Sequence, residues 1–280
     1  MTLIVFQSAW TYLEGAVAST YGVIKSVNKD IEIITATHEI PKFDIYSASY
    51  RLRQYVSFWP KGTIFVSVVD PGVGTKRRAC IARSEDGYYF VTPDNGTLTH
   101  VNIEHPIVEV REIDEERNRL QSTKGVAIFH GRDLFGYCAA KLASGLISYE
   151  EVGEKYPIEE IVKFDIEDPT YNAEGIEGYI EIDDPNFGNL WTNIDTNKAL
   201  EVFDYGKEVY VEVKKDNEIL YAGNTMFSKA FGDVNKGEVV LYNNELMKLA
   251  LAISQGSFKE EYKASFGPEY RISIGGKRDE

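Results

Sequence analysis

The order of strand-like and helix-like segments restricts this chain to a small group of folds. Up to about residue 150, short apolar runs alternate with segments of helical periodicity, whereas after about residue 165 the runs are almost all strand-like. In the first part, strands are predicted at 2–6, 31–34, 63–69, 88–91 and 125–130, and helices at 13–27, 45–58 and 133–144. Strands that alternate with helices are typical of an α/β layer with a largely parallel sheet.

The second part of the chain has a different pattern. Strands are predicted at 178–182, 199–203, 208–213, 219–222, 238–242 and 270–274, with one helix at 245–253. Short strands separated by Gly, Asp and Asn are typical of a small barrel or sandwich. Pro157 and Pro169 flank the expected linker. We therefore expect an N-terminal α/β domain at 1–166 and a C-terminal β-barrel-like domain at 172–280.

Charge and hydropathy exclude several classes of partner. The net charge of −14 comes entirely from residues 150–220, which hold 20 acidic and 6 basic residues. With this surplus and no basic run, no nucleic-acid partner is expected. No apolar run reaches the ~18 residues of a membrane helix, and the N-terminal run lacks a basic flank, so we expect no membrane association and no signal peptide. A cytoplasmic protein is predicted, with Cys80 and Cys138 as buried thiols.

Three segments place ionisable residues where an apolar strand ends. Asp70 follows the strand at 63–69, His130 ends the run at 125–130, and residues 183–191 combine acidic and aromatic side chains. In open α/β sheets, ligands bind outside the carboxyl ends of the strands. Each segment also has an ordinary structural explanation, since Asp before Pro-Gly is commonly a turn residue and a histidine after a strand is commonly a hydrogen-bonded core residue.

Metal and dinucleotide sites are not indicated. The four histidines show no spacing such as His-x-x-x-His, and the two cysteines do not form a Cys-x-x-Cys pair. The pair Gly72 and Gly74 lacks the third glycine of a dinucleotide loop and follows Asp-Pro. We therefore predict no metal.

Five motifs, taken together, resemble a known family. They are Thr-His-Glu-Ile-Pro at 37–41, Val-Val-Asp-Pro-Gly-Val-Gly at 68–74 followed by Arg-Arg, Thr-Pro-Asp-Asn-Gly at 92–96, Phe-His-Gly-Arg-Asp at 129–133, and Asp-x-x-Phe-Gly-Asn-Leu-Trp-Thr-Asn at 184–193. In this order the motifs resemble the S-adenosyl-L-methionine (SAM) hydroxide adenosyltransferases, the SAM hydrolases related to the fluorinase and chlorinase enzymes. The resemblance implies an α/β domain, a β-barrel domain and a homotrimer with SAM bound between subunits, at the N-terminal domain of one and the C-terminal domain of its neighbour.

The resemblance implies a reaction and three catalytic residues. SAM and water would give adenosine and L-methionine, with SAM as substrate and without a cofactor. Asp70 would orient the attacking water, His130 would hold or relay its proton, and Arg77 would fix the Asp70 carboxylate. The halogenating relatives replace the aspartate by Tyr and the His-Gly pair by Tyr-Ser. A carboxylate at this place would repel a halide, so Asp70 favours hydrolysis.

The resemblance also implies substrate contacts in both domains. Phe187 would stack on adenine, Asn189 would bond its edge, Asp184 would pair with the methionine ammonium, and Phe43 would pack over the sugar. From the residues alone, the alternative for Phe187 and for Trp191 is a place in the barrel core.

The first family motif departs from its pattern here. The family reads Thr-Asp-Phe-Gly after the first strand, and its aspartate holds the ribose hydroxyls, whereas this chain has Ala9 at that place and Trp10 after it. Trp10 is predicted to contact the substrate, and Glu14 is a candidate for the missing acceptor. In the second domain, 244–250 and Ser257-Phe258 also depart.

Three hypotheses follow from these departures. The first is a SAM hydrolase with an altered ribose pocket, and the second is an enzyme with the same chemistry on another adenosyl or nucleoside substrate. The third is a non-catalytic, trimeric adenosine- or SAM-binding protein.

Overall fold

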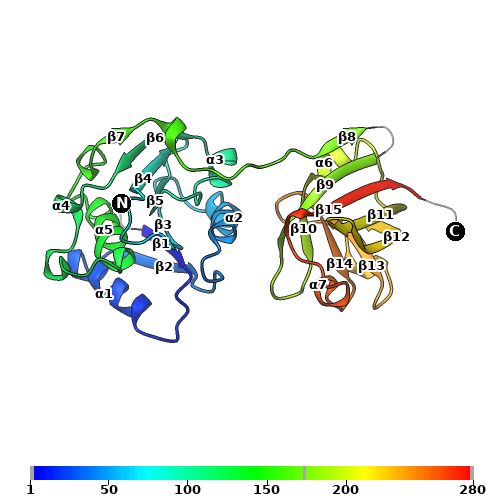
Figure 1. Cartoon of the computed structure of the whole chain (residues 1–280), viewed down its shortest axis with the longest axis horizontal. Helices are drawn as coiled ribbons and strands as arrows, with labels where there is room; N and C mark the ends of the chain where they lie inside the picture. The colour runs from blue at the N-terminus through cyan, green and yellow to red at the C-terminus, as the bar shows by residue number, and fades with distance from the viewer. Residues whose placement is uncertain (1–2, 173–174, 278–280) are drawn as a thin grey trace. The chain divides into compact units, whose positions relative to one another are not determined.

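The computed structural model describes residues 3–172 and 175–277 as two compact units, one that ends at Asp165 and one that begins at Ile166 (Figure 1). The first unit is α/β and the second is all-β apart from short helices. Within the described ranges, every helix is too short or too polar to cross a membrane.

A mixed sheet forms the centre of the first unit. Its strands run in the order β2-β1-β3-β5-β4-β6-β7. Neighbours from β2 to β5 pair in parallel, and the later pairs are antiparallel. The elements of this unit are β1 Leu3–Ser8, α1 Ala16–Val27, β2 Glu32–Thr37, α2 Ile45–Val56, β3 Ile64–Val68, β4 Ala79–Ser84, β5 Tyr89–Pro93, α3 Val101–Glu104, β6 Ile107–Glu112, α4 Glu115–Asn118, a π-helix Gly131–Gly136, α5 Tyr137–Ala143 and β7 Lys155–Tyr156. The α/β fold class is confirmed, with the parallel pairing confined to β1, β2, β3 and β5.

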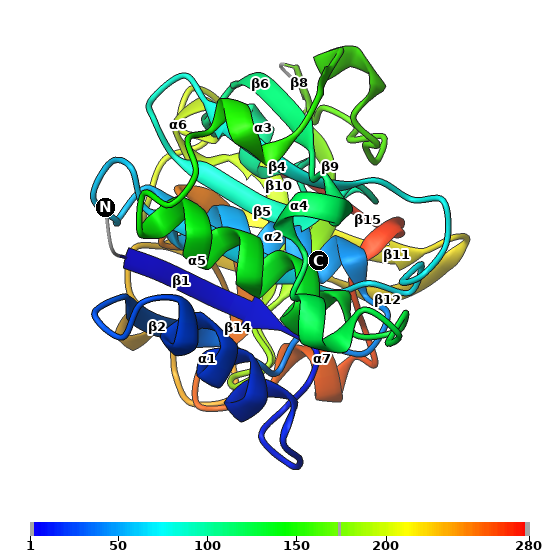
Figure 2. The ribbon, with the colours of Figure 1, turned by 90° about the vertical axis from the view of Figure 1, so that its left-hand side faces the viewer.

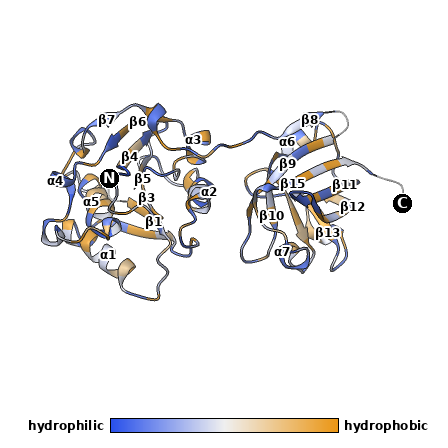
Figure 3. Cartoon of the chain, in the orientation of Figure 1, coloured by the Kyte–Doolittle hydropathy of each residue, from blue (hydrophilic) through white to orange (hydrophobic). Residues whose placement is uncertain are grey.

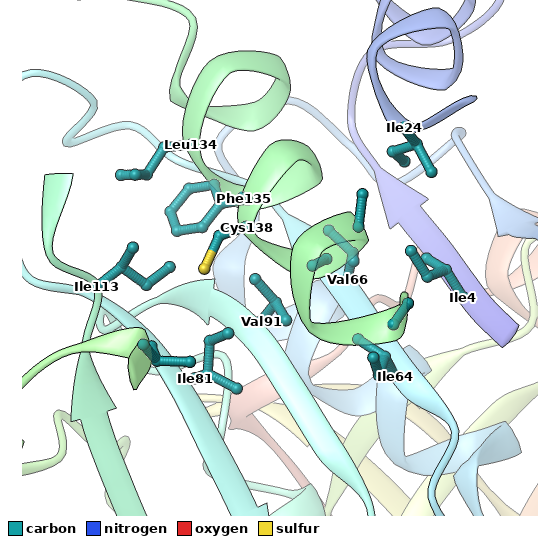
Figure 4. Close-up of a cluster of buried hydrophobic side chains, with 14 of the residues drawn as sticks. Ile4, Ile24, Ile64, Val66, Ile81, Val91, Ile113, Leu134, Phe135 and Cys138 are labelled. Atoms are coloured by element: carbon teal, nitrogen blue, oxygen red, sulfur yellow. The ribbon is translucent and has the colours of Figure 1, made fainter. Parts of the chain in front are cut away.

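Helices cover both faces of this sheet because its central strands are apolar on both sides. Successive residues of a strand point to opposite faces. In β1, Ile4 and Phe6 pack with α1 and α5, whereas Val5 packs with α2 and α3. Figure 2 shows α1 and α5 in front of the sheet and α2 behind it. Figure 4 shows Cys138 of α5 inside the first of these cores, where it is a free thiol, as predicted.

The predicted strand at 125–130 is wrong. These residues form turns that lead into the π-helix. Val126 and Ile128 are exposed, unlike the residues of the central strands. A further strand could not pair with β3 at the centre of the sheet, because β3 already lies between β1 and β5. A short apolar run does not by itself distinguish a strand from a loop that covers other residues.

The second unit is a closed barrel. Its elements are β8 Thr170–Asn172, β9 Gly175–Asp183, β10 Leu190–Asp195, α6 Thr196–Ala199, β11 Lys207–Lys215, β12 Glu218–Ser228, β13 Val239–Asn243, β14 Lys248–Ile253, α7 Phe258–Glu261 and β15 Gly267–Gly276. The order is β10-β14-β13-β12-β11-β15-β9, and β9 pairs again with β10, which closes a ring of seven strands in the described part of the chain. Figure 3 shows the alternation of apolar and polar residues along these strands. The barrel prediction is confirmed.

Two local predictions in the barrel are wrong. Residues 245–253 form a turn and the strand β14 instead of a helix, because β14 connects β10 to β13 and is buried between them. Residues 199–203 form the end of α6 and a turn instead of a strand. The Asp195 side chain accepts hydrogen bonds from the backbone N–H groups of Asn197 and Lys198, which starts a helix at this point.

The packing of α1 on the sheet gives a stability prediction. Ile24 is fully buried in the core beneath α1, so Ile24→Ala should lower the free energy of unfolding by about 2–5 kcal/mol. Leu146 lies just after α5 and is 63% exposed, so Leu146→Ala should change it by about 0.5 kcal/mol or less. Urea titration followed by tryptophan fluorescence measures both. Equal effects of the two substitutions would contradict the burial of α1.

Candidate functional site

The parallel pairing of β1 and β3 brings two loops to the same edge of the sheet. Ser8, the last residue of β1, lies beside Val68, the last residue of β3. The chain therefore leaves both strands at the same level, with Trp10 on one loop and Asp70 on the other. Asn95 supports the second loop, since its side-chain amide donates to the Val69 carbonyl at 2.9 Å.

Asp70 and Arg77 form a buried ion pair across the loop that follows β3. Arg77 Nε donates to Asp70 Oδ1 at 2.8 Å, and Arg77 Nη2 donates to Asp70 Oδ2. The two side chains are only 5% and 11% exposed, respectively. The loop turns back through Gly74, whose φ of +74° suits glycine. A two-point pair of this kind fixes the orientation of the carboxylate.

His130 completes a cluster with this pair. Arg77 Nη2 lies 3.2 Å from His130 Nδ1, and His130 is 6% exposed. The histidine stands immediately before the π-helix Gly131–Gly136. Turns of this type are rare and are frequently found at functional sites. The three residues Asp70, Arg77 and His130, which the sequence predicts to act together, are therefore in contact.

Trp10 packs directly on the turn that carries His130. A Cβ atom on Gly131 would lie 2.2 Å from Cζ2 of the Trp10 ring, so only glycine fits here. The ring also stands edge-on to Phe129, with 5.4 Å between the ring centres. Trp10 thus fixes the position of the His130 turn against the end of β3.

The surroundings of His130 hold its imidazole neutral near pH 7. Burial is the main reason that the pKa of His130 lies below its usual value, because burial disfavours the imidazolium. The charges of Arg77 and Arg119 lower this pKa as well, while those of Glu115 and Asp70 raise it. A neutral imidazole has one ring nitrogen that can accept a proton.

Arg119 is a member of this cluster that the sequence analysis missed. Its Nη1 lies 3.4 Å from His130 Nε2 and 2.8 Å from a Glu115 carboxylate oxygen. Neither residue lies in a motif or at the end of a strand. The contact arises from the folded path between α4 and the π-helix.

Phe43, Ala9 and Glu14 lie on loops at the same edge of the sheet, after β2 and β1. Phe43 is 75% exposed and Glu14 is exposed. Ala9 packs against the small apolar cluster of Ile40 and Val69. No carboxylate stands at position 9, and in the described part of the chain no hydrogen bond or ion pair joins Glu14 to Asp70, Arg77 or His130.

A network of neutral polar groups lies under this loop and was also missed. His38 Nδ1 is 2.7 Å from Ser8 Oγ, and its Nε2 is 3.0 Å from the Tyr21 hydroxyl. Burial lowers the pKa of His38 to about 4. His38 is therefore neutral and structural, which is the ordinary explanation for a histidine after a strand.

In the second unit, the turn between β9 and β10 carries the other candidate residues. Asp184 accepts hydrogen bonds from the backbone N–H groups of Asn186 and Phe187, at 3.1 and 3.4 Å. Gly188 follows with a φ of +68° and packs tightly against Ser257. The turn therefore has a defined shape and presents Phe187 outward.

A cavity of about 900 Å³ lies beside this turn. Phe187 lines it and is 68% exposed, while Asn189 lines it and is buried. Trp191 is 6% exposed and bonds the Tyr242 hydroxyl through its indole N–H at 3.3 Å, so this ring belongs to the barrel interior. The structure thus separates two aromatic residues for which the sequence allowed the same explanation.

The departures at 257–258 have a simple structural outcome. Phe258 is fully buried and packs against Tyr221 and Tyr262, so the larger residue fills the barrel core and not the cavity. Lys259, on the next position, lines the cavity and pairs with Asp183 at 2.5 Å.

The first unit therefore combines a fixed carboxylate, a neutral imidazole and a guanidinium, which together can orient a water molecule and take its proton. The second unit offers an exposed aromatic ring and a buried amide that line a cavity, which suits a heteroaromatic ring. Asp184 stands on the same turn but is not one of the residues that line the cavity. Among the residues that the structure describes, no group of three or more His, Cys, Asp or Glu side chains is arranged to hold a metal.

Comparisons with known proteins agree with this arrangement. Residues 4–153 match the SAM hydroxide adenosyltransferase N-terminal domain, and residues 178–271 match the C-terminal domain of the same family. The (R)-S-adenosyl-L-methionine hydrolase of Methanocaldococcus jannaschii is 33% identical over 83% of this chain and 81% of its own. The fluorinase of Nocardia brasiliensis is 26% identical over 98% and 97%.

A solved structure extends the likeness to the fold. An uncharacterized conserved protein from Thermotoga maritima superposes with a TM-score of 0.88 at 32% identity and covers 97% of this chain and 99% of its own. Both domain matches and the relatives confirm the resemblance found in the motifs, and the chain belongs to the SAM hydroxide adenosyltransferase family.

Proposed function

We propose that this protein hydrolyses SAM to adenosine and L-methionine, with Asp70, Arg77 and His130 as its catalytic residues. The observation that supports this most directly is the contact of these three side chains at the end of β3. The name of the Methanocaldococcus jannaschii relative, a SAM hydrolase, supports the same reaction.

The reaction needs a base but no redox step. The water oxygen forms a bond to C5′ while the C5′–S bond breaks, and the electron pair of that bond stays on sulfur. The sulfonium becomes the neutral thioether of methionine, and the attacking water releases one proton. Asp70 accepts a hydrogen bond from this water and orients it, and neutral His130 receives or passes on the proton.

Arg77 fixes the Asp70 carboxylate, and the Asp70 charge also attracts the sulfonium of the substrate. A halide would be repelled by the same charge, so we propose water as the nucleophile even though a fluorinase is among the relatives. In the second unit, Phe187 stacks on adenine, Asn189 bonds its edge and Asp184 pairs with the methionine ammonium. Phe43 and Trp10 lie on the sugar side.

The role of Asp70 can be tested by substitution. Asp70→Asn should lower the rate of adenosine release from SAM about 10²-fold or more, because the amide does not orient the water as the carboxylate does. Asp30 is exposed on the loop before β2, so Asp30→Asn is a matched control and should leave the rate unchanged. Chromatography of adenosine and methionine measures both.

Three outcomes would contradict the mechanism. An unchanged rate in Asp70→Asn would remove this residue from the reaction. Loss of activity in excess EDTA would show a metal requirement that the proposed roles do not include. A halogenated nucleoside formed in high chloride or fluoride would overturn the argument from charge.

We further propose a homotrimer in which the first unit of one subunit and the second unit of its neighbour share each SAM site. The loops around the catalytic cluster expose several large apolar side chains, which suits a contact surface. These side chains are Tyr12, Leu13, Phe43 and Ile128.

The assembly gives its own prediction. Light scattering should give a mass close to three chains of 31.6 kDa. Asp70→Ala and Asp184→Ala should each be inactive alone, and exchange of subunits between them should restore part of the activity, because some sites then combine two intact halves. A monomer that persists at high concentration, or no recovery after demonstrated exchange, would count against the shared site.

A second candidate, an altered nucleoside specificity or binding without catalysis, is favoured by one observation. The ribose-binding aspartate of the family pattern is Ala9 here, and Glu14 is exposed. A site with the carboxylate would reject a nucleoside that lacks a ribose hydroxyl, because the carboxylate would then be left unpaired. A site without the carboxylate has no such penalty.

The ribose prediction follows. Adenosine and 2′-deoxyadenosine should bind within about tenfold of each other, a gap of about 1.4 kcal/mol or less. Ala9→Asp should widen this gap by strengthening adenosine binding alone. Calorimetry with both ligands measures the gap. If the unmodified protein already prefers adenosine about a hundredfold, another residue holds the ribose, and Glu14→Gln should then abolish the preference.

A further inference from the structure

A second arginine stands against the catalytic histidine from the side opposite Arg77. Arg77 approaches Nδ1 of His130 at 3.2 Å, and Arg119 approaches Nε2 at 3.4 Å. Arg119 comes from the segment after α4 and its side chain is only 11% exposed. Both ring nitrogens of His130 therefore face a guanidinium group.

This arrangement favours a neutral imidazole ring over a charged one. A neutral imidazole has one ring nitrogen with a lone pair, which can accept a hydrogen bond from an arginine. An imidazolium has only N–H donors and can accept from neither arginine. Protonation of His130 would place N–H groups and a positive charge against two cations, with no acceptor on either arginine.

Two contacts hold the Arg119 guanidinium in this position, although one of its buried N–H donors is left without a hydrogen bond within the ranges that the structure describes. Its Nη1 also contacts Glu115 at 2.8 Å, and its Nη2 donates to the Val126 carbonyl. Its Nε is buried and has no hydrogen-bond partner among the described residues. A buried donor without a partner is unfavourable, and an ordinary loop contact does not require a guanidinium at this place.

We propose that Arg119 is a positioning residue for the hydrolysis proposed above, and that Glu115 limits its effect. Arg119 keeps His130 unprotonated before the water attacks and favours release of the proton that His130 then takes. This inference rests on the proposed function, since it names how the base of that reaction is kept ready.

The charges that face His130 have known signs. Arg77 and Asp70 come from the loop after β3, Glu115 from α4, and Arg119 from the segment that follows α4. The neighbouring charges Arg132 and Asp133 pair with each other. Loss of Arg119 removes a cation and leaves Glu115 without its partner, so both changes stabilise the imidazolium. Loss of Glu115 alone has the opposite effect.

The experiment is a pH titration by NMR of the whole protein with its four histidines labelled at Cε1, in which the missing signal of His130→Gln assigns His130. In Arg119→Met the midpoint of the His130 titration should rise by roughly one pH unit. In Glu115→Gln it should fall, and in Arg119→Lys, which keeps the charge, it should stay near the unmodified value. The exposed neighbours supply matched controls, Arg117→Met and Glu116→Gln, which should leave it unchanged.

The acid limb of kcat/KM for SAM should move with these midpoints, toward higher pH in Arg119→Met and lower pH in Glu115→Gln, because only neutral His130 accepts the proton. An unmoved midpoint in folded Arg119→Met would overturn the inference. A rise in both Arg119→Met and Glu115→Gln would assign the two residues a structural role and overturn it as well. If the midpoints move as expected and no SAM is hydrolysed, the proposed function fails and the role of Arg119 in setting the charge of His130 stands.

Discussion

A buried carboxylate that must be paired determines the shape of the catalytic edge. The parallel strand β3 delivers Asp70 to a place that solvent hardly reaches, where an unpaired charge is strongly unfavourable. The loop after β3 therefore folds back until Arg77 meets both carboxylate oxygens. This return brings the same guanidinium to His130. The ion pair of Asp70 and Arg77 thus fixes both its own loop and the position of His130, although His130 lies 53 positions after Arg77 in the sequence.

The scaffold and the site differ in how well sequence predicts them. The strands beneath the site were predictable because β1 and β3 are apolar on both faces, and the helices α1 and α2 because their apolar residues recur with a helical period. The cluster of Asp70, Arg77 and His130 was predictable only through its motifs, since spacing alone does not show that two loops meet.

The failures have physical causes of the same kind. The run at 125–130 is apolar, but it forms partly exposed turns outside the sheet. The run at 245–253 becomes a strand because the barrel needs one between β10 and β13. The position of Arg119 could not be predicted from the sequence, because its contact with His130 depends on the irregular path of the chain after α4. In each case the local structure depended on which strands and side chains the whole fold brings alongside the segment.

The π-helix before α5 has a consequence for how this protein tolerates changes of length. A π turn holds one residue more than an α turn of the same rise. Removal of one residue from Gly131–Gly136 would let the segment close as ordinary α-helix, with α5 still anchored by its buried residues such as Cys138. The chain before it would then keep its direction, because the π turn had held the extra residue. His130 would stay beside Arg77 and the sheet and its core would stay intact, so this segment, unlike the α-helical turns of α5, can lose one residue without moving the catalytic histidine.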